Sequence, residues 1–193
     1  MPRYKRRSRR PSNPSMPIHE MIDRSAIDRR EVYITGIINS EVQYYLTRIL
    51  AYLAQDSKKP INIILNTPGG LVADGLAIYD LLKTIGRRTP ISITATGQCM
   101  SMGAIILQAA NKRWATIHCA LGLHELSASN VGSYSDTEDT QKEIRKTQGA
   151  LNDIIVARSG MTKKKLQSLI ARRDRVFTPA EALELNLIDG VVE

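Results

Sequence analysis

The chain has few of the residues that build disulfide scaffolds or metal centres. Only two of its 193 residues are cysteines, Cys99 and Cys119, and both lie in apolar stretches. Two cysteines are too few for a disulfide framework, so we expect buried free thiols, as in proteins of a reducing compartment. The three histidines, His19, His118 and His124, are not spaced like a zinc-binding set. We therefore expect no metal site.

Long apolar runs and nucleotide-binding motifs are also absent. No apolar stretch approaches the roughly 18 residues that a membrane-spanning helix needs, so the sequence predicts no membrane partner. The apolar core of a secretory signal is missing as well. No G-x-x-x-x-G-K-[ST] motif occurs, which excludes that type of ATP site in this chain. We expect a protein without a bound cofactor, located in the cytoplasm or in an organelle stroma or matrix.

Positive charge is abundant, but it is concentrated at one end of the chain. The formal net charge is +8, and the first ten residues alone contain six basic residues. Residues 1–18 are rich in Arg, Ser and Pro and have no acidic residue, which is typical of a disordered basic arm or a processed leader. We predict one domain over 19–193, which is nearly neutral. Nucleic acid is not the favoured partner, since Tyr4 is the arm's only aromatic residue for base stacking.

Strand-like and helix-like stretches alternate along the first half of the chain. β-Branched and apolar residues predict strands at 32–35, 61–65 and 91–96. Apolar side chains at helical spacing predict one helix that starts at Ser40, with Gln43 completing a capping box, and a second helix over 71–85. This alternation implies parallel strands joined by right-handed crossovers, and therefore an α/β fold.

The second half of the chain contains one unusual element. Short strands are predicted at 114–117 and 120–123, followed by a long, highly polar helix over about 136–158. A helix this long and polar does not pack fully on its own domain, so we expect it to project and meet a partner chain. Residues 178–181 form a capping box with proline at the first helical position, and they predict a short helix before a last strand over 187–192.

The stretch Gly97–Ala104 joins a strand to a helix and places Ser101 in the first turn of that helix. Ser101 there is either a plain N-cap or a nucleophile. Free backbone N–H groups and the positive end of the helix would stabilise an oxyanion that forms at this point. The small residues around Ser101 leave room for a substrate carbonyl, which favours the nucleophile.

Three further candidates lie at element ends, where α/β folds place their sites. Pro68-Gly69-Gly70 is either a tight turn or a bend whose N–H groups bind an oxygen. His124 follows an apolar strand and is either a structural histidine or a base. Asp174, between two arginines, is either a surface charge or the carboxylate that orients the base. With Ser101, these residues supply the nucleophile, base, carboxylate and oxyanion donors that a Ser-His-Asp hydrolase needs. Their spacing does not show that they converge.

The order of these motifs resembles the proteolytic subunit of the Clp protease family, serine peptidases with a crotonase-like fold. The resemblance covers about Val32 to Val192. It rests on Asn66-Thr67-Pro68-Gly69-Gly70, Ile78-Tyr79-Asp80, Gly97-Gln98 with Ser101-Met102-Gly103-Ala104, the strand that ends at His124, and Arg173-Asp174-Arg175 with Pro179-Ala180-Glu181-Ala182. It implies an α/β fold of repeated strand–strand–helix units with a projecting long helix.

The resemblance also implies roles for individual residues. Ser101 would be the nucleophile, His124 the general base and acid, and Asp174 the carboxylate that orients it. Gly70 and Met102 would supply the oxyanion-hole N–H groups. The residues implied to clamp an extended peptide by backbone pairing are Gly69, Leu71, Val72, Glu125 and Leu126. The family pattern has Gln-Pro after the histidine, whereas this chain has Glu125-Leu126.

The resemblance further implies partners. The chain would form stacked heptameric rings, a tetradecamer, and receive unfolded proteins from an AAA+ unfoldase that uses the ATP. The aromatic residues that line the family's unfoldase-docking pocket are missing from 62–65, so these residues do not support that docking. The basic arm would surround the axial pore.

Three alternative functions stay open. The chain could be a phage or mobile-element protease with a narrow substrate, for example in head maturation. It could instead be a catalytically silent ring subunit, or a crotonase-like acyl-CoA enzyme.

Overall fold

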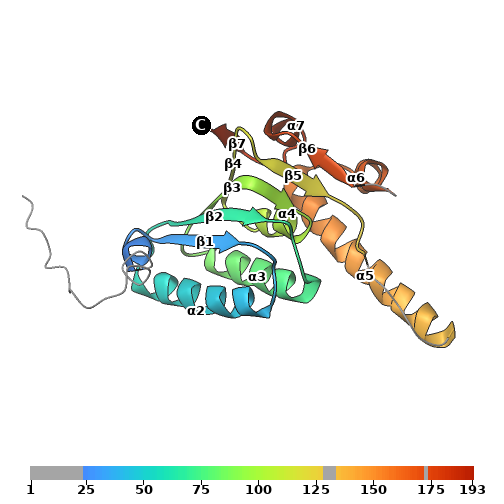
Figure 1. The fold of residues 1–193 in the computed structure, drawn as a ribbon, viewed down its shortest axis with the longest axis horizontal. Coiled ribbons are helices and arrows are strands. Elements are labelled where there is room, and N and C mark those ends of the chain that lie inside the picture. The colour runs from blue at the N-terminus through green and yellow to red at the C-terminus, as the bar shows by residue number, and fades with distance from the viewer. Residues whose placement is uncertain (1–23, 128–133, 172–173) are drawn as a thin grey trace, which may run out of the picture.

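A computed structural model describes residues 24–127, 134–171 and 174–193, and within them one seven-stranded sheet forms the centre (Figure 1). Its strands are β1 (Glu31–Thr35), β2 (Ile61–Thr67), β3 (Ile91–Met100), β4 (Lys112–Thr116), β5 (Ala120–Leu123), β6 (Arg175–Phe177) and β7 (Gly190–Val192). The helices are α2 (Ser40–Asp56), α3 (Val72–Ile85), α4 (Met102–Leu107), α5 (Tyr134–Ser159), α6 (Lys163–Ile170) and α7 (Pro179–Glu184). The predicted α/β fold class is confirmed.

The sheet divides at β3. Parallel strands run in the order β1-β2-β3-β4-β7, as the strand–helix alternation predicted. β3 pairs with β4 through Ser92–Ala95 and with β5 through Gln98–Met100. The second branch continues from β5 to β6, which is antiparallel to it. The sequence did not predict this antiparallel strand, because three residues are too few to show a period.

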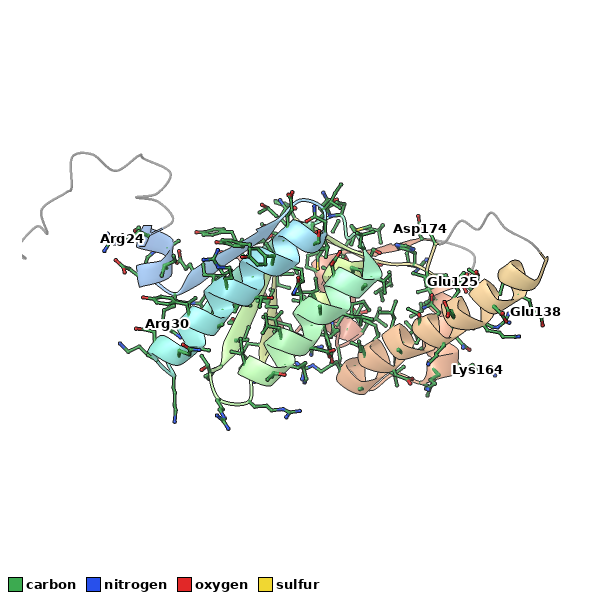
Figure 2. The ribbon with its side chains drawn as sticks, turned by 90° about the horizontal axis from the view of Figure 1, so that it is seen from below. Arg24, Arg30, Glu125, Glu138, Lys164 and Asp174 are labelled. Carbon is green, nitrogen blue, oxygen red and sulfur yellow. The ribbon has the colours of Figure 1, made fainter. Side chains whose placement is uncertain are left out.

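The core lies between the sheet and its helices. Alternate residues of the central strands are buried, among them Ile63 and Leu65 on β2 and Ile93 on β3. Helices α2 and α3 lie together on one face of the sheet (Figures 1 and 2). The apolar residues that α2 buries there are Leu46, Ile49, Leu50 and Leu53. Burial of these aliphatic side chains supplies the main driving force for the fold.

Helix ends follow the predicted pattern with one exception. The capping box of α7 is confirmed, because the Thr178 side chain accepts from the Glu181 N–H while the Glu181 carboxylate accepts from the Thr178 N–H. The capping box predicted at Ser40 is wrong by one residue. Asn39 is the N-cap of α2, and its Oδ1 accepts from the Val42 N–H at 3.0 Å. An asparagine side chain caps as well as a serine, so the pattern alone did not separate the two positions.

The long helix α5 projects from the domain, as its polarity predicted (Figure 1). Over residues 138–159 of this helix, the buried residues are Leu151, Ile155 and Ser159, all in the C-terminal half. Residues 138–150 of the helix are exposed or half-buried. The apolar stripe is therefore buried where the helix packs against α4 and α6. None of the helices in the described ranges has both the length and the apolarity that a membrane span requires.

A buried arginine ties the last strand to the sheet. Arg113 on β4 is 4% exposed, and its side chain donates to the Asp189 carboxylate, to Gln108 Oε1 at 2.6 Å and to the Asn186 carbonyl at 2.9 Å. Asp189 also accepts from the Arg113 backbone N–H. Desolvation alone would raise the pKa of Asp189, but the hydrogen bonds from Arg113 outweigh it and hold the pKa below its ordinary value.

We predict that Asp189→Asn lowers the free energy of unfolding by about 2 kcal/mol at neutral pH, because it leaves the Arg113 guanidinium buried without its counter-charge. The folded pKa of Asp189 is lowered, so its charge stabilises fully above the ordinary carboxyl value of about 3.9. That contribution is lost as the pH falls through the folded pKa. Urea denaturation of both proteins at neutral and at acidic pH measures the difference.

The matched control is Glu184→Gln, which removes an exposed carboxylate on the neighbouring helix α7. This change should leave the free energy of unfolding within about 0.5 kcal/mol of that of the parent protein. Equal midpoints for Asp189→Asn and Glu184→Gln at neutral pH would contradict the anchoring role of the Arg113 ion pair.

Candidate active site

Ser101 lies at a sharp turn between β3 and α4. Its backbone has φ 54° and ψ −120°, a conformation that costs a residue with a side chain about 1–3 kcal/mol. Ser101 occupies the N-cap position of α4, yet its side chain makes no capping hydrogen bond. A plain capping role therefore does not account for this serine. A strained strand-to-helix turn is also how α/β-hydrolases expose a nucleophilic serine.

The surroundings hold this strained turn in place. The Ser101 N–H donates to the Gly122 carbonyl on β5 at 2.9 Å. Gly69 packs directly behind the serine, and a Cβ on Gly69 would lie 2.6 Å from the Ser101 Cβ. A Cβ on Gly103 would lie 2.5 Å from the Thr67 side chain. The small residues near Ser101 therefore allow close packing behind it, a different reason from the substrate access that the sequence suggested.

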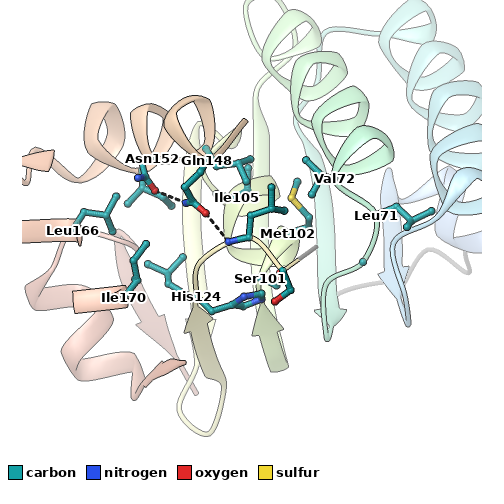
Figure 3. Close-up of a pocket in the computed structure, with 16 residues that line it drawn as sticks. Leu71, Val72, Ser101, Met102, Ile105, His124, Gln148, Asn152, Leu166 and Ile170 are labelled. Carbon is teal, nitrogen blue, oxygen red and sulfur yellow. Dashed lines mark hydrogen bonds between the residues drawn. The ribbon is translucent and has the colours of Figure 1, made fainter. Parts of the chain in front are cut away.

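A cavity of about 240 Å³ opens in front of Ser101 (Figure 3). Ser101 and His124 lie at one end of it. The deeper walls are apolar and consist of Ile105, Leu123, Leu151, Ile155, Leu166 and Ile170. Gln148 and Asn152 of α5 add the polar side chains of this wall. The cavity thus joins two reactive side chains to an apolar recess.

The His124 imidazole lies next to Ser101 in Figure 3. Its Nδ1 is 2.6 Å from the carbonyl oxygen of Glu125. Because a carbonyl only accepts hydrogen bonds, a neutral imidazole in this position carries its proton on Nδ1, and Nε2 is left as an acceptor. The side chains of Ser101 and His124 are not hydrogen-bonded to each other in this structure. Catalytic hydrogen bonds often close only in the complex with substrate.

Asp174 comes directly before β6, the antiparallel neighbour of β5. Leu123 pairs with Arg175, and continuing this register by one residue places Asp174 opposite His124. Directly opposed residues of antiparallel strands have Cα atoms about 4.5–5.5 Å apart. The carboxylate itself is at the surface (Figure 2) and is not hydrogen-bonded to His124 or to any other described residue. The fold brings the two residues side by side, but the side chains do not form a closed triad here.

The two predicted oxyanion donors both line the cavity. Ile38 forms a parallel bridge with Gly70, in which the Ile38 N–H donates to the Gly69 carbonyl and the Leu71 N–H donates to the Ile38 carbonyl. In such a bridge, Gly70's own N–H points away from Ile38. Met102 is the first residue of α4, so its N–H has no acceptor within the helix. Neither N–H group is therefore taken up by the Ile38 bridge or by helix α4.

The predicted substrate-binding residues occupy different positions around the cavity. Leu71, Val72 and Leu126 are among the residues that line it. Gly69 lies behind Ser101, as described above, and Glu125 is exposed. The backbone N–H groups of Leu71 and Leu126 are already hydrogen-bonded, to Ile38 and to Gln148 respectively.

Sequence reasoning missed Gln148 and Asn152. They are four residues apart on α5, and Leu151 and Ile155 line the same cavity. Residues at this spacing share one helix face. The signal was a pair of uncharged polar residues beside the narrow apolar stripe, but a highly polar helix offers many such pairs, so the sequence alone gave no reason to select this one.

The described residues hold no other reactive centre of the kinds considered above. Within them, no group of three or more His, Cys, Asp or Glu side chains could hold a metal ion. Cys99 and Cys119 are buried free thiols, as predicted. Desolvation raises the pKa of both thiols, that of Cys119 to about 11. Both are therefore protonated at neutral pH and poor nucleophiles.

We predict that Ser101→Gly is more stable than Ser101→Ala, by about 1 kcal/mol, because only glycine adopts the positive φ of this turn without strain. Neither variant has the hydroxyl, so loss of the nucleophile does not enter the comparison. Thermal denaturation of the two proteins measures the difference. A Ser101→Ala variant as stable as Ser101→Gly would show that the turn relaxes when the serine is removed.

A protein family and a solved structure are similar to this chain. The family model described as Clp protease matches residues 18–193. Among solved structures, a point mutant of ClpP1 from Listeria monocytogenes is similar, with a TM-score of 0.81 and 26% sequence identity. The match covers 89% of this chain and 96% of the Listeria chain. The family model spans most of the sequence, and the fold is shared over nearly all of the other protein. The chain therefore belongs to the Clp protease family.

Proposed function

We propose that the chain is a serine endopeptidase subunit that cleaves unfolded polypeptides through an acyl-enzyme at Ser101. The observation that carries this proposal is the strained Ser101 turn. The Ser101 hydroxyl makes no capping hydrogen bond and lies at a cavity that His124 also lines. A serine in this conformation is costly and makes no structural hydrogen bond with its side chain. Family membership supports peptidase chemistry.

The geometry suggests how the reaction proceeds. Ser101 Oγ attacks the peptide carbonyl while its proton passes to His124 Nε2, and the N–H groups of Gly70 and Met102 stabilise the oxyanion. His124 then gives the proton to the leaving amine, which departs with the C-terminal fragment. Water attacks the acyl-enzyme with His124 again as base, which releases the acid and restores Ser101. Asp174, opposite His124, would turn inward and stabilise the imidazolium.

The recess beside Ser101 suggests which peptide bonds are cleaved. Its walls are aliphatic, and the polar side chains of Gln148 and Asn152 are hydrogen-bonded to each other. A charged substrate side chain would lose its water there without gaining an ionic partner. We therefore propose cleavage after large apolar residues.

The surface is consistent with assembly of several copies. At the β1 side of the molecule, Tyr44, Tyr45 and Tyr52 of α2 are exposed around a groove. At the opposite edge of the sheet, Ile117 and Val191 are also exposed. Two different apolar patches at opposite edges suit a head-to-tail contact, which closes into a ring when the rotation allows it.

We propose such rings, stacked through α5 into a tetradecamer and supplied with substrate by an ATP-using AAA+ unfoldase. The projecting half of α5 would reach the second ring. The basic arm at 1–18 lies outside the described residues, and its place at the axial pore stays a prediction.

We predict that Ser101→Ala lowers peptidase activity about 10⁴- to 10⁶-fold, because the nucleophile is lost, while assembly is unchanged. His124→Ala and Asp174→Asn should each slow fluorophosphonate labelling of Ser101, and their effects should not add, because the three residues act as one unit. Labelling, a fluorogenic peptide assay and native mass spectrometry measure these outcomes. Undiminished turnover by Ser101→Ala would refute the mechanism.

The same measurements separate the alternatives. A catalytically silent ring subunit would assemble normally without labelling of Ser101. A crotonase-like acyl-CoA enzyme would keep its thioester activity in the Ser101→Ala variant. A protease with a narrow substrate would be labelled but would leave generic peptides uncut.

We predict that peptides with leucine or methionine before the scissile bond are cleaved at least about 100-fold faster, by kcat/KM, than peptides with aspartate there. The apolar recess stabilises the former, and the desolvated carboxylate penalises the latter by about 3 kcal/mol or more. A matched peptide series that differs only at this residue measures the ratio. Equal cleavage of the two series would mean that the recess does not receive the substrate side chain.

A further inference from the structure

The peptide group between Glu125 and Leu126 is hydrogen-bonded on both sides. Its carbonyl oxygen is 2.6 Å from Nδ1 of His124. Its N–H donates to Oε1 of Gln148 at 2.5 Å. Because a peptide unit is planar, the carbonyl and the N–H point in opposite directions and move together. The orientation of this one peptide unit therefore determines whether Nδ1 of His124 has the Glu125 carbonyl as its hydrogen-bond partner.

The hydrogen bonds continue into helix α5 (Figure 3). Gln148 Nε2 donates to Oδ1 of Asn152 at 2.8 Å. The chemistry fixes the direction of the chain, since the Leu126 N–H requires an acceptor and the amide oxygen of Gln148 is the acceptor it meets. An unbroken series of donors and acceptors thus connects the imidazole with α5. Such series strengthen each bond through mutual polarisation.

The sequence explains why this chain needs such a bond. The resembling family has Gln-Pro after the histidine, whereas Glu125-Leu126 stand here. Proline has no N–H and a fixed φ, so it restrains the segment covalently. Leucine at position 126 removes that restraint and adds a donor that must be satisfied in a half-buried position. Gln148 satisfies the donor and restores the restraint through a hydrogen bond.

We propose that Gln148 is a positioning residue for His124: it holds the Glu125–Leu126 peptide so that the carbonyl fixes the imidazole with its proton on Nδ1. Nε2 is then the acceptor that faces Ser101. This role rests on the proposed function of His124 as the base. It also makes α5 part of the active site, because any displacement of the helix at Gln148 is passed through one peptide unit to the histidine ring.

The first experiment compares two substitutions of similar size in the full-length protein. Gln148→Leu removes the acceptor, and we expect kcat to fall about 10-fold with little change in KM, since the Leu126 N–H is left unsatisfied and the peptide is released. Gln148→Glu keeps an oxygen acceptor, so its kcat should be close to that of the parent protein. The matched control is Gln167→Leu, the same substitution at an exposed position of the neighbouring helix α6, outside the cavity.

The two variants also test a merely structural role. If Gln148 only forms the wall of the recess, both substitutions change KM, and the buried charge of Gln148→Glu is at least as harmful as leucine. That result, or an unchanged kcat in Gln148→Leu, would overturn the proposal.

A second measurement does not depend on activity. The chain has three histidines, so ¹⁵N-histidine labelling gives three pairs of imidazole signals, one Nδ1 and one Nε2 signal for each ring, and the pair lost in His124→Gln belongs to His124. We expect the Nδ1–H tautomer for neutral His124 in the parent protein and a mixture of both tautomers in Gln148→Leu. The same tautomer ratio in both proteins would refute the proposal, whatever kcat the peptidase assay gives for Gln148→Leu. Full turnover by Ser101→Ala would instead refute the proposed function, while the tautomer ratio still decides the role of Gln148.

Discussion

The strained backbone of Ser101 is the constraint on which the rest of the site depends. A left-handed conformation at a residue with a side chain persists only where its surroundings do not let it relax. Here β5 accepts the Ser101 N–H through Gly122, and Gly69 closes the space behind the serine. Helix α4 then begins at Met102, whose N–H has no acceptor within the helix. The proposed nucleophile and one of the proposed oxyanion donors thus follow from a single turn.

The division of the sheet at β3 places the other groups around that turn. β3 leaves β4 after Ala95 and pairs with β5 instead, so the residues that follow both strands emerge at the same edge. Ser101 follows β3 and His124 follows β5, while the antiparallel β6 presents Asp174 from the opposite direction. Because β3 and β5 are parallel, the residues that follow them meet at their carboxyl ends. Because β6 is antiparallel, the residue that lies there is the one before its first residue. The Ser-His-Asp set therefore comes from β3 and from the β5–β6 branch of the sheet.

Sequence patterns were reliable where the signal was local. The alternating strands and helices, the polar length of α5 and the Thr178–Glu181 capping box each depend on residues a few positions apart, and each is present. The order of the motifs alone also indicated the Clp protease family, to which the chain belongs. The N-cap of α2 was misplaced by one residue, because Asn39 and Ser40 are both good capping residues and local preference does not separate them.

The sequence by itself determined the α/β class, the turn at Ser101 and the identity of the candidate triad, because these reside in local periodicity and in ordered motifs. Only the tertiary structure decided which acceptor the His124 ring meets, that the Asp174 carboxylate lies at the surface, and that Gln148 touches the segment after β5. Those contacts join residues far apart in the chain or depend on the rotation of one peptide unit. No local pattern encodes such a rotation, because its energy comes from partners that only folding brings within hydrogen-bond distance.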